Sequence, residues 1–170
     1  MRAFFVLAVA VILGFVLSPL LRADAACTPT PTTPSPGTWN DEQLANARII
    51  VTAGTERRVP HQGMVIAVAT ALQESGLRNL RGGDRDSIGL FQQRPSQGWG
   101  TPKQLRDPVY QTRKFYDKLL DVDGWQQMRL TEAAQAVQVS AYPEAYTKHT
   151  RAATALVETL SAPAGCTPEG

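Results

Sequence analysis

The chain has 170 residues, enough for one domain with a hydrophobic core and too few for two domains of ordinary size. Its 17 basic and 15 acidic residues nearly balance, and no basic block is interleaved with aromatic residues, which argues against nucleic acid as a partner. The two histidines, His61 and His149, stand far apart and outside any ligand-spaced cluster, so the sequence predicts neither a metal ion nor another cofactor.

Residues 1–25 have the character of an export signal. Met1 and Arg2 give a positive start, an apolar run extends over residues 3–21, and residues 23–25 (Ala-Asp-Ala) have the small-x-small spacing that a signal peptidase reads. The apolar run is also nearly long enough to span a bilayer, so an uncleaved membrane anchor is the alternative. Either way, the sequence predicts a protein that is secreted or held at the cell surface or cell wall.

Export changes the interpretation of the two cysteines. Cys27 and Cys166 bracket the chain that follows the signal, and outside the cytosol such a pair is predicted to form a disulfide bond. A bridge of this kind stabilises a domain by roughly 2–5 kcal/mol. Residues 26–38 are a Pro/Thr-rich linker, residues 39–162 form the folded domain, and residues 163–170 form a C-terminal tail.

Helical patterns follow one another through the folded domain. Asn40 or Asp41 can cap the first helix, Pro60 and Pro143 suit helix starts, and Thr131 can cap another helix. The sequence predicts helices over residues 41–57, 60–75, 108–120, 131–140 and 143–160. The second helix is apolar all round, which predicts that it is buried at the centre. The expected fold class is therefore mainly α, with about five helices around a buried core helix and a glycine-rich loop or short hairpin after it.

Glu74 is the single acidic residue of this central helix and lies at its C-terminal end. Partial burial and the negative end of the helix dipole both disfavour ionisation, so both raise the pKa of the carboxyl group. A carboxyl group that still holds its proton near neutral pH can serve as a general acid. An ordinary, exposed glutamate at a helix end is the competing interpretation of its position.

The loop after the helix favours the catalytic interpretation. Gly89 permits close backbone approach, and Phe91 can anchor the loop to the core. Gln92 and Gln93 supply amide groups of the type that bind sugar hydroxyl and acetamido groups. Trp99 can offer an aromatic surface to a sugar ring, with burial in the core as the alternative.

Two aspartates in the same loop are candidates for a second carboxylate. Asp84 and Asp86 follow Glu74 by 10 and 12 residues. Loop capping and a local salt bridge are the alternative roles for both. Ser75 is expected to orient Glu74 or to finish the helix.

These residues resemble the active-site region of the lysozyme-like superfamily, in particular soluble lytic transglycosylases and goose-type lysozymes. The resemblance lies in Glu74-Ser75 at the end of a buried helix and in residues 89–92 (Gly-Leu-Phe-Gln) one loop later. Residues 136–146 are similar to the helix segment that lines the cleft in that family, with Tyr146 as the better matching tyrosine and Tyr142 as the second choice. The resemblance implies a lysozyme-like fold and cleavage of the β-1,4 bond between N-acetylmuramic acid and N-acetylglucosamine in peptidoglycan.

Two reactions are compatible with this resemblance. A lytic transglycosylase needs only Glu74, which acts first as acid and then as base while a 1,6-anhydro sugar forms. A hydrolytic muramidase also needs a carboxylate that activates water, here Asp84 or Asp86. The sequence favours the transglycosylase, because Gln93-Arg94 stands where such lysozymes can carry a further aspartate.

Two interpretations without catalysis also remain open. The same fold can serve as a cell-wall-binding module that keeps the sugar cleft, or as a subunit that packs against a partner at the cell surface. The expected partners are peptidoglycan glycan strands, with membrane contact only through the N-terminal segment. The protein is expected to be a monomer.

Overall fold

The computed structural model describes residues 39–139 and 144–162, and the helices in these ranges confirm the mainly α class. The α-helices are α1 (Asp41–Glu56), α2 (His61–Ser75), α3 (Pro108–Leu120), α4 (Leu130–Gln138) and α5 (Thr150–Ser161). Short 3₁₀ helices are η1 (Pro95–Gln97), η2 (Gln104–Arg106), η3 (Trp125–Gln127) and η4 (Thr147–His149). No helix in the described ranges is long and apolar enough to cross a membrane.

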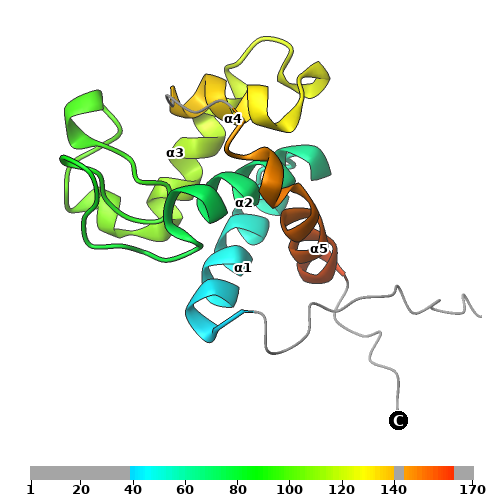
Figure 1. Ribbon diagram of the computed structural model, residues 1–170, viewed down its shortest axis with the longest axis horizontal. Coiled ribbons are helices and arrows are strands. Elements are labelled where there is room, and N and C mark those ends of the chain that lie inside the picture. The colour runs from blue at the N-terminus through cyan, green and yellow to red at the C-terminus, as the bar shows by residue number, and fades with distance from the viewer. Residues whose placement is uncertain (1–38, 140–143, 163–170) are drawn as a thin grey trace, which may run out of the picture.

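The central helix is α2, as the sequence predicted. Every residue from Gly63 to Leu72 is buried, and α2 packs against each of the other four α-helices. Figure 1 shows α2 in the middle, with α1 and α5 on one side and α3 and α4 on the other. A helix without an exposed face needs such a surround, because its side chains are apolar in every direction.

Local sequence signals explain where α1 and α3 begin. The Asn40 side chain accepts the Gln43 N–H at 2.9 Å, and the Gln43 side chain accepts the Asn40 N–H at 3.0 Å, which forms a capping box. Asp107 caps α3 by accepting the Val109 N–H at 2.9 Å, and Pro108 takes the first position of the helix. Both starts agree with the predicted ranges.

The start of α4 differs from the prediction. Arg129 is the N-cap, because the Glu132 carboxylate reaches back to accept the Arg129 N–H at 2.9 Å. Thr131 is therefore buried inside the first turn and does not cap the helix.

The last helix also starts later than predicted. Residues 144–146 form a turn, η4 follows, and α5 begins at Thr150. The chain turns here through short-range bonds such as His149 N–H to the Tyr146 carbonyl, at 3.0 Å. This turn leaves Tyr146 fully buried beside the end of α2.

The glycine-rich segment between α2 and α3 forms a lobe beside α3 (Figure 1). Its central feature is a pair of reciprocal bonds, Ile88 N–H to Gln93 carbonyl at 3.0 Å and Gln93 N–H to Ile88 carbonyl at 3.1 Å. This single antiparallel bridge is the short hairpin that the sequence allowed. Among the described residues no longer strand is present.

Candidate active site

The end of α2 is held by polar contacts from α1. Gly76 adopts a left-handed conformation (φ 63°) and ends the helix. The Gln43 amide donates to the Gly76 carbonyl at 2.9 Å, and the buried Asn46 amide donates to the Leu77 carbonyl at 2.8 Å. These two bonds fix the direction in which the chain leaves the helix, and with it the position of the preceding glutamate.

Glu74 is partly buried and receives hydrogen bonds from the far part of the chain. The Tyr146 hydroxyl donates to Glu74 Oε1 at 2.9 Å, and the Gln138 side chain also hydrogen-bonds the carboxyl group. Burial raises the pKa of Glu74, while these two bonds oppose the rise because they stabilise the ionised form. The net direction is upward, which is the direction that a general acid requires.

Ser75 joins the helix end to the loop. Its Oγ lies 2.7 Å from the Leu90 carbonyl and 3.1 Å from the Ala71 carbonyl, and it accepts the Arg78 N–H at 3.2 Å. Ser75 therefore holds the Gly-Leu-Phe-Gln turn against α2 and contacts backbone atoms in each of these three bonds.

The turn at residues 89–92 depends on a buried glutamine of α3. The Gln111 Oε1 accepts the Phe91 N–H at 3.1 Å, and its Nε2 donates to the Leu105 carbonyl at 2.8 Å. Gly89 has φ 79°, and a Cβ at this position would collide with the Gln111 amide. The glycine is needed both for its backbone conformation and for this close approach.

Gln138, at the end of α4, connects the acid to the turn. Its Nε2 donates to the Phe91 carbonyl at 2.9 Å, and the same side chain hydrogen-bonds Glu74. Gln138 has no catalytic signal of its own in the sequence, although it lies in the segment 136–146 that carries the family resemblance. Gln111 has none either; its one signal is that it shares the buried face of α3 with Phe115, four residues later.

The structure brings part of the predicted site together. Glu74 is hydrogen-bonded to Tyr146, and Gln138 links it to the turn at residues 89–92, which contains Gly89 and which Ser75 holds through the Leu90 carbonyl. Phe91 takes part through its backbone only, because its ring is fully buried and stacks on Phe115 with 4.8 Å between ring centroids. The ring therefore anchors the turn, as the sequence suggested.

The two adjacent glutamines have different surroundings. Gln92 is partly exposed, and its Nε2 donates to the Gly89 carbonyl at 2.9 Å. Gln93 is buried, and its Nε2 donates to the Gln111 carbonyl at 3.1 Å. Of the two, Gln92 is the one that can present amide atoms to a bound molecule.

The two aspartates of the loop do not share the surroundings of Glu74. Asp86 accepts from Arg94 Nε at 2.6 Å and from the Ser96 N–H and hydroxyl at 2.8 and 3.0 Å, and these bonds hold its pKa well below its usual range. The Asp84 side chain is 94% exposed, with Arg85 Nε at 3.9 Å. Asp86 therefore has the alternative role of loop capping with a local salt bridge, whereas Asp84 makes a longer, exposed ion pair with its neighbour Arg85.

Trp99 is only 4% exposed, so its ring offers little surface to a sugar. The Lys118 ammonium lies 3.7 Å from the ring centroid, and the Tyr110 hydroxyl donates to the Trp99 carbonyl at 3.2 Å. These contacts attach the loop lobe to α3.

The remaining predictions fall outside the part of the chain that the structure describes. Cys27, Cys166 and Tyr142 lie in the ranges 1–38, 163–170 and 140–143, as do the export segment and the linker. Within residues 39–139 and 144–162, no group of three or more His, Cys, Asp or Glu side chains could hold a metal ion.

Comparisons with protein-family models and with curated proteins gave no match for this chain.

Proposed function

We propose that this mainly helical domain has a lysozyme-like fold and that the protein is an exported lytic transglycosylase. Its substrate would be the β-1,4 bond between N-acetylmuramic acid and N-acetylglucosamine in peptidoglycan. The observation that carries the proposal is Glu74 at the end of the buried helix α2, with a raised pKa and with Tyr146 and Gln138 as hydrogen-bond donors. The family resemblance of residues 74–75 and 89–92 supports it.

In this reaction Glu74 acts twice. The protonated carboxyl group donates its proton to the glycosidic oxygen as the bond from muramic C1 to that oxygen breaks. The muramic 6-hydroxyl then attacks C1, and the Glu74 carboxylate takes the hydroxyl proton. The products are a 1,6-anhydromuramic end and a free 4-hydroxyl group, and Glu74 is protonated again. The Tyr146 hydroxyl donates to one carboxyl oxygen, Oε1, and would stabilise the carboxylate that forms when Glu74 gives up its proton.

The hydrogen bonds of Asp86 favour this reaction over hydrolysis with Asp86 as the base. A hydrolase of the inverting type needs a second carboxylate that activates a water molecule. Asp86 has its acceptor capacity occupied by Arg94 and Ser96, which stabilise it as an ion and make it a poor base. Transglycosylation requires no such group.

The test is mass spectrometry of the soluble products released from purified peptidoglycan. The wild-type protein is expected to release 1,6-anhydromuramic products, and Glu74→Gln to reduce the rate by at least about 10²–10⁴-fold, the usual contribution of a general acid. Glu158→Gln, at an exposed position of α5, is the matched control and should retain the wild-type rate.

Other outcomes would replace the proposal. Reducing-end muramic products would indicate a hydrolase and would make Asp84→Asn and Asp86→Asn the next variants. If the wild type and Glu74→Gln both release nothing but both sediment with the wall, the protein is a binding module. If neither sediments, the subunit interpretation is favoured.

A further inference from the structure

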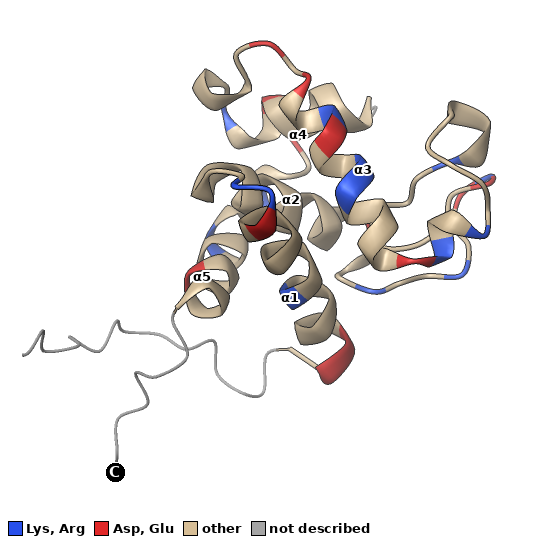
Figure 2. Cartoon of the chain, turned by 180° about the vertical axis from the view of Figure 1, so that it is seen from behind, with Lys and Arg blue, Asp and Glu red and all other residues tan. Residues whose placement is uncertain are grey.

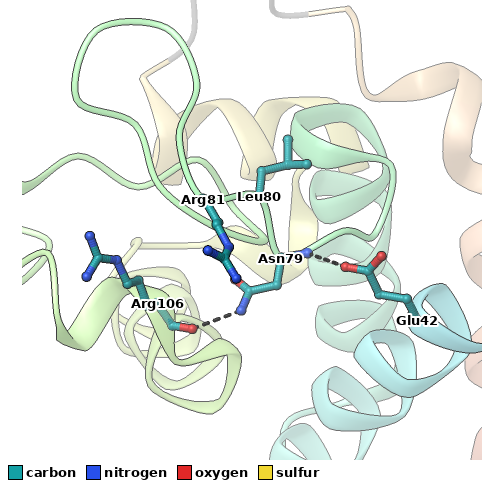
Figure 3. Close-up of a pocket in the computed structure, with 5 residues that line it drawn as sticks. All are labelled: Glu42, Asn79, Leu80, Arg81 and Arg106. Carbon is teal, nitrogen blue, oxygen red and sulfur yellow. Dashed lines mark hydrogen bonds between the residues drawn. The ribbon is translucent and has the colours of Figure 1, made fainter.

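A groove of about 650 Å³ lies on the segment that follows Glu74, away from the hydrogen bonds that hold the acid. Its lining residues come from α1, from the loop after α2, and from η2: Glu42, Asn79, Leu80, Arg81 and Arg106 (Figure 3). Its volume lies in the range of sites that hold small molecules or short peptides, about 300–1,000 Å³.

The floor of the groove is built around one asparagine. The Asn79 N–H donates to Glu42 Oε1 at 3.1 Å, and Asn79 Nδ2 donates to the Arg106 carbonyl at 2.8 Å. Asn79 Oδ1 accepts from Gln111 Nε2 at 3.2 Å, and Gln111 is the same buried residue that binds the Phe91 N–H. The groove is therefore preformed and shares its support with the turn beside Glu74.

The groove has charges of opposite sign at its two sides. In Figure 3 the Arg81 and Arg106 side chains lie on one side of Asn79 and the Glu42 carboxylate on the other. Both arginines are exposed, and within residues 39–139 and 144–162 neither guanidinium has an ion-pair partner. Exposed, unpaired arginines in a concave site are suited to carboxylate or phosphate groups.

The surrounding lobe adds to the positive potential. Residues 77–107 contain six basic and three acidic side chains. Asp86 and Asp84 already pair with arginines of the same loop, and Asp107 caps α3. Figure 2 shows several basic positions along this lobe, next to α3.

We propose that this groove binds the peptide stem of peptidoglycan, an acidic peptide that also carries an amine. Arg81 and Arg106 would hold its carboxylates, Glu42 its side-chain ammonium group, and Leu80, 36% exposed, would contact an alanine methyl group. The proposal rests on the proposed function and names the part of the substrate that is not sugar. Glu42 disfavours a phosphate polymer, because such a polymer would place further negative charge beside the carboxylate.

The reach of a stem peptide agrees with this position. Asn79 is five residues from Glu74, so their Cα atoms lie at most about 18 Å apart along the chain. An extended stem of four or five residues spans about 13–18 Å by the same measure. The distance between Glu74 and the groove is therefore within the reach of a stem peptide.

The test is a calorimetric titration of the full chain with a free stem tetrapeptide that has carboxylates and one side-chain amine. The double variant Arg81→Gln/Arg106→Gln is expected to bind about tenfold more weakly, as two exposed charge pairs allow. The control, Arg48→Gln/Arg151→Gln, removes the same charge at exposed positions outside the groove and should bind within about twofold of the wild type. A tetrapeptide with amidated carboxylates tests the same contacts without a change in the protein, and it should bind as weakly as the double variant binds the acid form.

Any one of three results would overturn the inference. The wild type does not bind the peptide at millimolar concentration, the wild type and the double variant bind it equally well, or the wild type binds a glycerol-phosphate oligomer more tightly than the peptide. Cleavage of peptide-free glycan strands separates this inference from the proposed function. An enzyme without a peptide site would cleave peptide-free strands and intact strands equally well. A protein that binds the peptide but cleaves neither kind of strand would contradict the proposed function and would still support the assignment of the groove.

Discussion

Two opposing effects set the pKa of the Glu74 carboxyl group, and a point mutation can remove each of its hydrogen-bond donors separately. Burial favours the protonated form, while the Tyr146 hydroxyl and the Gln138 amide favour the ionised form. Such a balance suits the proposed function, in which Glu74 would first donate a proton and then recover one. The balance also makes the pKa of Glu74 sensitive to each donor.

Tyr146→Phe is predicted to raise the pKa of Glu74 further. The variant keeps the buried ring and removes the hydroxyl that donates to Oε1. The carboxyl resonance of Glu74, followed by ¹³C NMR as a function of pH, should therefore titrate at a higher pH than in the wild type. Tyr110→Phe removes a hydroxyl that binds the Trp99 carbonyl and should leave the Glu74 titration unchanged. An unchanged or lower midpoint in Tyr146→Phe would contradict the assigned role of the hydroxyl.

Glu74→Gln is predicted to stabilise the fold more at high pH than at low pH. The folded-state pKa of Glu74 is raised above its value in the unfolded chain. The stability that this group contributes is therefore fully present below the unfolded pKa, about 4.3, and is lost as the pH rises through the folded pKa. The amide does not titrate, so the Tm of the variant should increase relative to that of the wild type as the pH rises through the folded-state pKa of Glu74.

Thermal unfolding monitored by circular dichroism measures this difference across the pH range. Glu158→Gln, at an exposed site of α5, is the control for removal of one negative charge. A Tm difference between Glu74→Gln and wild type that does not change with pH, or that falls as the pH rises, would mean that burial does not control this carboxyl group.

The turn at residues 89–92, which forms one wall of the proposed active site, takes its shape from α3. Gly89 in the turn and Gln111 in the helix are in close contact, and Gln111 also fixes the Phe91 N–H. The turn has little regular structure of its own, since one antiparallel bridge closes it. Its geometry therefore depends on packing against α2 and α3.

Two glycines of this lobe allow the cost of backbone strain to be measured apart from the cost of a steric clash. Gly89 and Gly98 have nearly equal φ values, 79° and 77°, but a Cβ at Gly98 would meet no atom within 4 Å, whereas a Cβ at Gly89 would collide with Gln111. Gly98→Ala should cost about 1–2 kcal/mol for the left-handed conformation alone. Gly89→Ala should cost about 1–3 kcal/mol more, the usual cost of overpacking. Urea denaturation measures the loss of unfolding free energy in each variant. Equal losses would mean that the Gln111 side chain moves aside without a measurable loss of stability.

The starts of the helices show how far local sequence determines the secondary structure of this domain. Asn40 with Gln43 and Asp107 with Pro108 are self-contained capping signals, so α1 and α3 could be predicted within a residue of their observed bounds. Thr131 carries an equally good local signal, but the reach of Glu132 back to Arg129 moves the helix start. The turn at residues 144–149 has a tertiary cause, the burial of Tyr146 against Glu74, which a local pattern does not contain.

For the whole molecule, the candidate site is assembled from segments that are distant in the sequence. Glu74 and Tyr146 are 72 residues apart, and Gln138 and Phe91 are 47 apart. Motif spacing could identify the glutamate and suggest the tyrosine, because both lie in stretches that carry a family resemblance. It could not identify Gln138 or Gln111, whose importance comes from where the fold places them, nor could it decide whether Trp99 is buried.

The predicted bond between Cys27 and Cys166 concerns the stability of the whole domain. Figure 1 shows the start of α1 and the end of α5 at the same end of the molecule, and Figure 2 agrees. A bridge between the flanking segments should stabilise the fold by roughly 2–5 kcal/mol. Urea denaturation with and without reductant should show this difference, and Cys27→Ser/Cys166→Ser should not respond to reductant. Equal midpoints for the oxidised and reduced wild type would contradict the prediction.

The enclosure of α2 has a consequence for motion. A helix packed on all sides exchanges its amide hydrogens only when the whole domain opens, whereas a lobe closed by few backbone bonds opens locally and more often. Glu74 lies on the enclosed helix, so we expect its position to change less often than that of the turn at residues 89–92, which one antiparallel bridge closes. In the proposed reaction, a long polymer would then enter as the turn moves, while the proton donor keeps its place.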